Sequence, residues 1–383
     1  MHSTTTALPV HPGGPSPRFR TLGRVPDLFA PLTLARGPAA PNRVWLAPLT
    51  NTQSHPDGRL SDEELHWLAL RARGGHGLTM SCAAHVQAGG QGFPGQLGVF
   101  SDDHLPGLTR LAAALDDAGS LSSLQLHHAG IRSPQELVGQ PVGPSDDEET
   151  GARAMTTDEV GQLVEDFAVA AERAQQAGFH GIEVHGAHGY VVAQFLSPET
   201  NRRTDAYGGS LENRARLLSE ILTAVRARCR EDFQVGVRLS PERFGLRLGE
   251  IRDVAAELMG RGDVDYLDMS LWDVAKMPVE EEYSDRPLMD WFTDLDRGTT
   301  RLGVAGKVRS GKGAAETIER GADFVMVGRA AILHHDFADR VRRDGGFVPV
   351  KTPVSPEHLA GEGLSPVFVE YMRNWRHFVT DAS

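Results

Sequence analysis

The sequence predicts an α/β protein whose single domain is a (β/α)8 TIM barrel, and three observations lead to this fold class. The chain has 383 residues, of which 40% are hydrophobic, and α/β barrels commonly reach this size as one domain. Eight short apolar runs alternate with amphipathic segments, which is typical of a parallel sheet covered by helices. No G-x-G-x-x-G follows the first run, and this disfavours an open dinucleotide-binding sheet.

Strands and helices are expected in regular succession along the chain. Thr156 and Glu159 form a capping-box pattern, so a long helix should begin at this point. Strands are expected at 44–49, 78–83, 121–126, 181–185, 235–239, 266–270, 302–305 and 324–327. Helices are expected at 61–73, 105–118, 157–177, 211–230, 250–260, 313–320 and 331–342.

The chain divides into an arm, a barrel and a tail. Residues 1–25 are rich in Pro, Gly, Ser and Thr and are expected to form a flexible arm. The barrel should span 26–350, and residues 351–383 should form a C-terminal tail and helix that pack on the barrel or on a partner subunit. Two long loops, 131–155 after the third strand and 272–300 after the sixth, should overhang the mouth where TIM barrels carry their active sites.

Composition and charge exclude several classes of function. The net charge of −12 opposes binding to nucleic acid or to anionic membranes. No apolar run approaches the ~18 residues of a membrane span, and residues 1–20 lack a signal-peptide pattern. Two cysteines, Cys82 and Cys229, are too few for an iron–sulfur cluster or a structural zinc. We expect a cytoplasmic protein that acts on small molecules and has no metal site.

The motif His185-Gly-Ala-His188-Gly-Tyr190 begins where the fourth strand should end, at the catalytic face of a barrel. Two imidazoles can bind one carbonyl oxygen and polarise a conjugated C=C bond, and a phenol can protonate the neighbouring carbon as a general acid. The histidine pair could instead bind a metal, or could be two satisfied polar residues at a strand end. The motif alone leaves these interpretations open.

The motif continues into VVAQFLSP at 191–198 and NRRTDAYGGSLENR at 201–214. This block resembles the signature of the Old Yellow Enzyme family, and the resemblance extends over residues 27–375. It implies bound FMN, NADPH or NADH as hydride donor, and an electron-poor alkene as the small-molecule substrate. In the implied ping-pong reaction, His185 and His188 hold the substrate oxygen, flavin N5 delivers hydride and Tyr190 supplies the proton.

The resemblance also indicates how FMN lies in the barrel. It implies that the Thr50 hydroxyl bonds the flavin C4 carbonyl, that Gln125 bonds the pyrimidine edge, and that Arg238 lies beside N1 and C2=O. Polar side chains inside apolar strands need such partners, and the loops after strands seven and eight of TIM barrels often bind phosphate. The implied cofactor-binding residues are Ala47, Pro48, Leu49, Thr50, Ala83, Gln125, Arg238, Gly306, Lys307, Gly328 and Arg329.

The segment PVFVEYMRNW at 366–375 resembles the tail of the thermophilic-like branch of the family, in which a terminal Arg reaches into the neighbour's active site. This implies a homodimer or homotetramer in which Arg373 binds substrate in the partner's pocket. An Arg on an amphipathic terminal helix is also what surface packing would give. The chain departs from that branch at Thr50 and Thr52, where the branch favours Cys and Tyr.

Three other functions are alternatives to this one. A flavin-free phosphosugar aldolase or isomerase would use the same phosphate loops, but no Lys lies in strands one to six to form a Schiff base. A flavin-binding protein without alkene turnover would hold FMN that NAD(P)H does not reduce. A larger relative with an iron–sulfur cluster needs more cysteines than this chain has.

Overall fold

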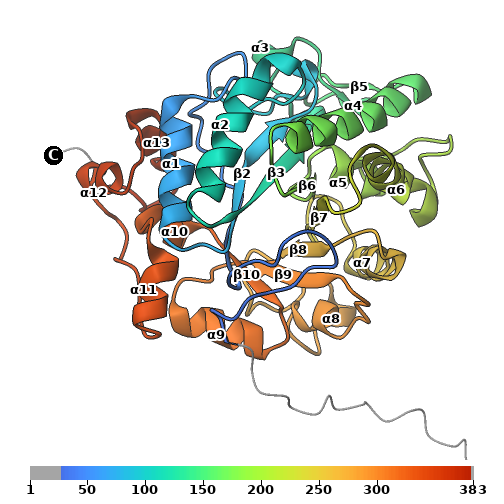
Figure 1. Ribbon diagram of the computed structural model, residues 1–383. Coiled ribbons are helices and arrows are strands. Elements are labelled where there is room, and N and C mark those ends of the chain that lie inside the picture. The colour runs from blue at the N-terminus through green and yellow to red at the C-terminus, as the bar shows by residue number, and fades with distance from the viewer. Residues whose placement is uncertain (1–26, 381–383) are drawn as a thin grey trace, which may run out of the picture.

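The computed structural model describes residues 27–380, so the arm predicted at 1–25 lies outside the described residues. Eight parallel strands close into a barrel in the order β1-β10-β9-β8-β7-β6-β3-β2, and helices surround it (Figure 1). The predicted TIM barrel is therefore confirmed, and each predicted strand is present. The barrel strands are β1 (Val44–Leu46), β2 (Leu78–His85), β3 (Leu121–His127), β6 (Gly181–Gly186), β7 (Gln234–Leu239), β8 (Tyr266–Ser270), β9 (Arg301–Ala305) and β10 (Phe324–Val327).

Six of the seven predicted helices are present with ends shifted by a few residues. The capping box of Thr156 and Glu159 is formed as predicted, with reciprocal bonds between side chain and backbone. The prediction missed α5 (Val191–Leu196), which directly follows the histidine motif. The main barrel helices are α1 (Asp62–Arg73), α2 (Leu105–Asp116), α4 (Thr157–Gln176), α6 (Leu211–Arg228), α7 (Leu248–Arg261) and α9 (Gly311–Glu319).

The single helix predicted at 331–342 is wrong, because the structure has two helices, α10 (Arg329–Leu333) and α11 (Phe337–Arg343). The backbone N–H of His335 donates to the Glu362 carboxylate at 2.7 Å instead of to the carbonyl four residues back. That carbonyl, of Ala331, accepts from the buried guanidinium of Arg71 at 3.2 Å. Two long-range partners thus replace the hydrogen bond that would have continued the helix.

The two long loops contain short elements. The 131–155 loop holds α3 (Gln135–Val138) and a small parallel pair, β4 (Val142–Gly143) and β5 (Arg153–Ala154). The 272–300 loop holds α8 (Asp290–Thr293). Single 3₁₀ turns occur at η1 (Ala88–Gly90), η2 (Asp102–His104), η3 (Gly130–Arg132) and η4 (Glu281–Tyr283).

The tail packs on the barrel near the start of the chain's first helix. It forms α12 (Pro356–Gly361) and α13 (Pro366–Met372), each with a Ser N-cap. The ring of Phe368 lies 5.3 Å from that of Trp67 in α1, edge to face. The Ser365 backbone N–H donates to Gln53 at 3.2 Å, close after β1. These contacts bring the last residues of the tail to the mouth of the barrel.

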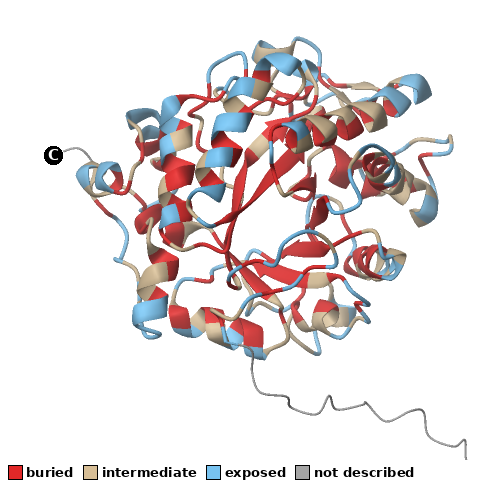
Figure 2. Ribbon diagram, in the orientation of Figure 1, coloured by how far each residue is buried: buried red, intermediate tan, exposed pale blue. Residues whose placement is uncertain are grey.

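An aromatic plug fills the amino-terminal half of the barrel. Trp45 stacks on Phe324 with ring centroids 3.7 Å apart, and Tyr266 meets Trp45 edge to face at 5.4 Å. All three side chains are fully buried, and the strands that carry them are almost entirely buried (Figure 2). Glycine at 303 leaves room for this plug, because a Cβ there would lie 2.0 Å from the Phe324 ring. The barrel is thus closed below its mouth, as a packed core.

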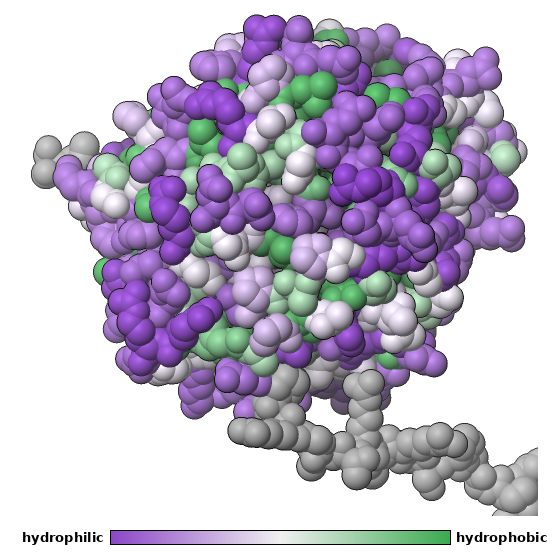
Figure 3. Space-filling model, in the orientation of Figure 1, coloured by the Kyte–Doolittle hydropathy of each residue, from purple (hydrophilic) through white to green (hydrophobic). Residues whose placement is uncertain are grey.

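The surface differs from this interior. The face shown in Figure 3 is largely hydrophilic, with hydrophobic residues confined to small separate patches. None of the helices in the described part of the chain combines the length and the hydrophobicity that a bilayer crossing demands.

Substituting Gly303→Ala should lower the free energy of unfolding by about 3 kcal/mol, because overpacking against a fixed ring forces the barrel strands apart. Urea unfolding of the variant and the parent would measure this loss. Gly161→Ala in α4 is the matched control, since a Cβ there meets nothing within 4 Å and alanine favours the helix. A Gly303→Ala variant as stable as the control would contradict the described packing.

Candidate active site

A cavity of about 570 Å³ opens at the carboxyl ends of the barrel strands, large enough for a cofactor and a small substrate. Every predicted site residue except Arg373 lines it, although these residues come from seven different strands and their loops. The predicted residues that line the cavity are Ala47, Pro48, Leu49, Thr50, Ala83, Gln125, His185, His188, Tyr190, Arg238, Gly306, Lys307, Gly328 and Arg329.

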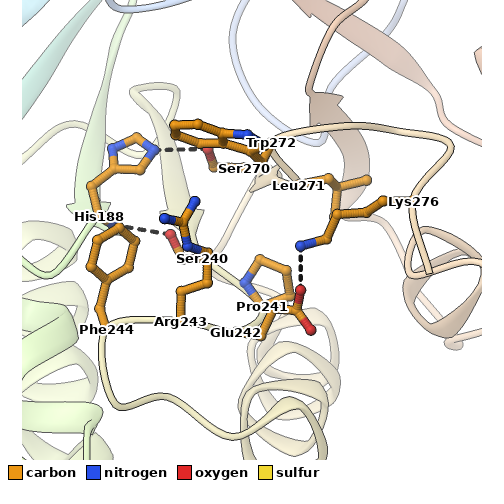
Figure 4. Close-up of a pocket in the computed structure, with 10 residues that line it drawn as sticks. All are labelled: His188, Ser240, Pro241, Glu242, Arg243, Phe244, Ser270, Leu271, Trp272 and Lys276. Atoms are coloured by element: carbon orange, nitrogen blue, oxygen red, sulfur yellow. Dashed lines mark hydrogen bonds and ion pairs between the residues drawn. The ribbon is translucent and has the colours of Figure 1, made fainter. Parts of the chain in front are cut away.

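The two motif histidines form one hydrogen-bonded chain. The backbone N–H of Ala187 donates to His185 Nδ1 at 3.2 Å, which leaves the proton of the neutral ring on Nε2. His185 Nε2 lies 3.3 Å from His188 Nδ1, and His188 Nε2 lies 2.8 Å from the Ser270 hydroxyl. The backbone N–H of His188 donates to Ser240, so both serines orient this residue (Figure 4). Two facing imidazole nitrogens therefore border the same part of the cavity.

Both imidazoles are neutral at physiological pH. Burial lowers the pKa of His185 well below its ordinary range, and the neighbouring His188 adds to this effect. Burial also lowers the pKa of His188 to about 3, with further contributions from the cations Arg238, Arg132 and Arg243. A neutral imidazole has one donor and one acceptor nitrogen, so this pair can bind an oxygen without carrying charge.

Tyr190 stands beside the pair as the N-cap residue of α5. Its ring meets His127 edge to face at 4.3 Å and His185 at 5.2 Å. The guanidinium of Arg132 lies over the same ring, 4.8 Å from its centroid. Burial raises the pKa of the Tyr190 phenol, and Arg132 opposes this shift. The phenol therefore keeps its proton at neutral pH.

The inner wall of the cavity carries a buried polar layer. Gln125 donates to Glu183 at 2.7 Å, and Arg238 pairs with Asp268 at 2.9 Å. Glu183 and Asp268 are fully buried. Burial raises the pKa of Glu183, and the nearby Asp268 raises it further. Gln125 and Arg238 are thereby held with their side chains at the cavity surface.

The end of the cavity away from this inner wall is formed by loops that carry cationic side chains. Gly306 has a φ of 155°, and a Cβ on it would lie 2.7 Å from the backbone nitrogen of Asp273. Lys307 pairs with the Asp273 carboxylate at 2.7 Å. Arg329 opens α10 and lies near Arg309, a cation that the sequence analysis did not select. The cavity fits a phosphorylated flavin. The hydrogen-bond donors of the inner wall suit the flavin ring, and the cations beside accessible backbone at the other end suit the phosphate.

Several residues that line the cavity were not predicted from the sequence. Those from the tail could not have been found from local pattern, because the tail reaches the mouth only through tertiary packing. Arg132, Arg243 and Arg309 lie just beyond strand ends, and that position was an available signal. The additional polar and aromatic residues that line the cavity are Phe93, His127, Arg132, Arg243, Phe244, Ser270, Trp272, Arg309, Tyr371 and Trp375.

Backbone strain is concentrated around the same cavity. Of the seven non-glycine residues with positive φ in the described chain, six lie in loops after barrel strands. Such conformations cost about 1 to 3 kcal/mol each and persist where surrounding structure imposes them. These six residues are Thr52, His188, Arg243, Phe244, Trp272 and Lys307.

Arg373 does not line the cavity of its own chain. Its side chain pairs with Glu370 at 3.1 Å and donates to the carbonyl of Thr380 at 3.0 Å. Its predicted role in a partner's pocket stays a prediction.

The fold and the cavity define a TIM-barrel enzyme with a site for a phosphorylated aromatic cofactor beside a neutral histidine pair and a tyrosine. A model of the NADH:flavin oxidoreductase / NADH oxidase family matches residues 27–345. A probable NADH-dependent flavin oxidoreductase of Bacillus subtilis, YqiG, is 36% identical over 327 residues, covering 82% of this chain and 87% of its own. An NADPH dehydrogenase of Halalkalibacterium halodurans is 35% identical over 305 residues, covering 77% and 88%.

Solved structures agree with the sequence relatives. Morphinone reductase in complex with tetrahydroNAD has a TM-score of 0.73 and 30% identity, covering 87% of this chain and 94% of its own. An Old Yellow Enzyme homologue from Zymomonas mobilis has a TM-score of 0.76 and 28% identity, covering 90% and 99%. The chain belongs to the NADH:flavin oxidoreductase family, the family of Old Yellow Enzyme. It is an FMN-dependent NAD(P)H oxidoreductase, and the flavin-free phosphosugar alternative is wrong.

Substituting Glu183→Gln should stabilise the flavin-free protein increasingly as pH rises. Glu183 has a raised pKa in the folded state, so the folded protein binds this proton more tightly than the unfolded chain does. The free energy of unfolding therefore falls as pH rises above about 4.3, the ordinary pKa of Glu, and stops falling once the pH exceeds the folded-state pKa of Glu183. The total loss is about 1.4 kcal/mol for each unit by which folding raises that pKa. The glutamine oxygen still accepts from Gln125. Urea unfolding at about pH 5 and about pH 8 would measure the difference, and an equal effect at both would contradict the burial argument.

Proposed function

We propose that this enzyme reduces C=C bonds conjugated to a carbonyl or a similar electron-withdrawing group. One observation carries the proposal: His185 Nε2 and His188 Nδ1 lie 3.3 Å apart at the cavity surface, with the Tyr190 phenol beside them. A carbonyl oxygen bound by both nitrogens would be polarised, and its β-carbon would become electron-poor. Bound FMN would supply the redox chemistry, because hydride from NADPH or NADH would reach that carbon by way of the flavin.

The serine beyond His188 supports this binding mode. In the described arrangement His188 Nδ1 accepts from His185, so it must acquire a proton to donate to a substrate oxygen. His188 Nε2 would then accept from the Ser270 hydroxyl, which lies 2.8 Å away and can either donate or accept. Ser270 therefore lets His188 adopt the tautomer that substrate binding needs, without a change of ring position.

Tyr190 is proposed as the acid that protonates the α-carbon. Its raised pKa keeps the phenol protonated, and Arg132 over the ring would stabilise the phenolate left by proton transfer. The cofactor contacts are proposed at the lining residues named above: Gln125 and Arg238 at the pyrimidine edge, Thr50 at C4=O, and the loops of Gly306 and Gly328 at the phosphate. NAD(P)H and alkene would bind in turn in the same cavity.

Assembly and location are further parts of the proposal. A homodimer or homotetramer is proposed, in which Arg373 reaches the cavity of a partner subunit. The neighbouring tail residues Tyr371 and Trp375 support this, because they lie at the mouth of their own chain's cavity. A cytoplasmic location is proposed because both cysteines are free, and Cys82 is buried.

An anaerobic absorbance experiment tests the proposed function. Flavin bands near ~370 and ~450 nm should bleach when NADPH or NADH is added and recover when 2-cyclohexenone follows. Bleaching without recovery would leave a flavin oxidoreductase that does not reduce this class of alkene. Bound flavin that neither nucleotide reduces would indicate a flavin-binding protein without turnover.

Substituting Tyr190→Phe should slow flavin reoxidation by alkene by about 10² to 10⁴-fold, which is the usual contribution of a general acid. Flavin reduction by NAD(P)H should slow much less, because that half-reaction needs no proton from Tyr190. Stopped-flow measurement of the two half-reactions separates these effects. An equal loss in both would overturn the assignment of Tyr190 as the proton donor.

A further inference from the structure

Among the described residues, six cations and no carboxylate line the cavity, although the chain as a whole carries a net charge of −12. Its six cationic residues fall into groups with different surroundings. Arg238 pairs with Asp268 in the inner wall, and Lys307 pairs with Asp273 at the rim. Arg309 and Arg329 stand at the end that fits the cofactor phosphate. Neither Arg132 nor Arg243 has been given a contact with the cofactor or the substrate, although Arg132 also lies over the Tyr190 ring.

Arg132 is held in place beside the reacting groups. It lies in the turn after β3, its guanidinium stacks over the Tyr190 ring at 4.8 Å, and it donates to the His188 carbonyl. Within the described residues it has no ion-pair partner. A guanidinium stacked on a ring still presents N–H groups at its edge, where a carboxylate can bind.

Arg243 approaches His188 from the loop after β7. Its guanidinium lies 4.6 Å from the Trp272 ring and 5.5 Å from the Phe244 ring, and it points towards the space between His188 and Trp272 (Figure 4). The adjacent carboxylate of Glu242 is already paired with Lys276 and accepts the backbone N–H of Val279. Arg243 therefore also has no ion-pair partner among the described residues.

Both arginines act on the oxygen-binding pair, because each of them lowers the pKa of His188 through its charge. They line the same cavity as His185, His188 and Tyr190, from two different loops. A ligand whose oxygen lies between the two histidines would therefore share the cavity with two stacked guanidinium groups that have no ion-pair partner among the described residues. Such groups bind carboxylates through short, charge-assisted hydrogen bonds.

We propose that Arg132 and Arg243 form a second subsite that selects alkene substrates carrying a carboxylate, in addition to the carbonyl held by His185 and His188. This inference rests on the proposed function and names the substrate class within it. The phosphates of NAD(P)H are the other anions that enter this cavity. We favour a carboxylate on the alkene over these phosphates as the bound anion. Both cations lie beside His188, where the reacting end of a ligand binds, whereas the phosphates of the nucleotide extend away from its reacting nicotinamide.

The test compares two alkenes that differ only in charge: a cyclohexenone with a carboxyethyl side chain, and the matching primary amide. In the parent enzyme kcat/KM should be higher for the acid than for the amide, and added salt should reduce the preference. Arg132→Gln and Arg243→Gln should each reduce the acid-to-amide ratio about tenfold, the usual scale for a charge-assisted bond. Arg247→Gln is the control, because it removes the same charge from the same loop outside the cavity.

Two further measurements separate the possible outcomes. Titrating oxidised enzyme with the saturated carboxylic acid, followed by flavin absorbance, reports anion binding without turnover, and the dissociation constant should rise about tenfold in both variants. Rapid-mixing reduction with NADPH reports nucleotide binding. An unchanged acid-to-amide ratio would overturn the proposal, and weaker NADPH binding in the same variants would assign the cations to the nucleotide phosphates. A parent that reduces neither alkene would refute the proposed function, while the titration would still test the subsite.

Discussion

The buried pair of Arg238 and Asp268 is the interaction on which the site depends. Asp268 is fully buried and Arg238 is only 6% exposed, so neither charge could remain inside the barrel without the other. The pair lies one layer above the aromatic plug, since Asp268 follows the plug residue Tyr266 by two positions on β8. It therefore adds a charged pair to the polar layer of Gln125 and Glu183, with positive charge directed towards the cavity.

The fold was predictable because the signals for it are local. Each barrel strand is a short apolar run, and the Thr156 capping box fixed the start of α4 from residues three apart. The error at 331–342 has the opposite cause, since the helix is interrupted by Arg71 and Glu362, which come from distant parts of the chain. The apolar residues keep a helical spacing across that break, so no local pattern could reveal it.

The site was predictable where a residue type is unusual for its position. His185, Gln125 and Arg238 interrupt apolar strands, and all three line the cavity. Arginine is not an unusual residue type in a chain whose basic residues are almost all Arg, so only their position after strand ends could have indicated Arg132 and Arg243. The tail residues that line the mouth were missed for a different reason, since long-range contacts, such as those of Phe368 with Trp67 and of Ser365 with Gln53, bring them there.

Charge and burial act together on the histidine pair. Burial alone would keep both imidazoles neutral, and the surrounding arginines make a positive charge on His188 still less favourable. In the proposed reaction the pair would therefore bind an oxygen by hydrogen bonds from neutral rings, and the arginines would supply the positive potential. In alkene reduction negative charge would develop on the bound oxygen after hydride transfer, and fixed cations near it require no proton to stabilise that charge. In that reaction Tyr190 would be the protonated group beside the pair, and none of the described residues that line the cavity carries a carboxylate to oppose this positive potential.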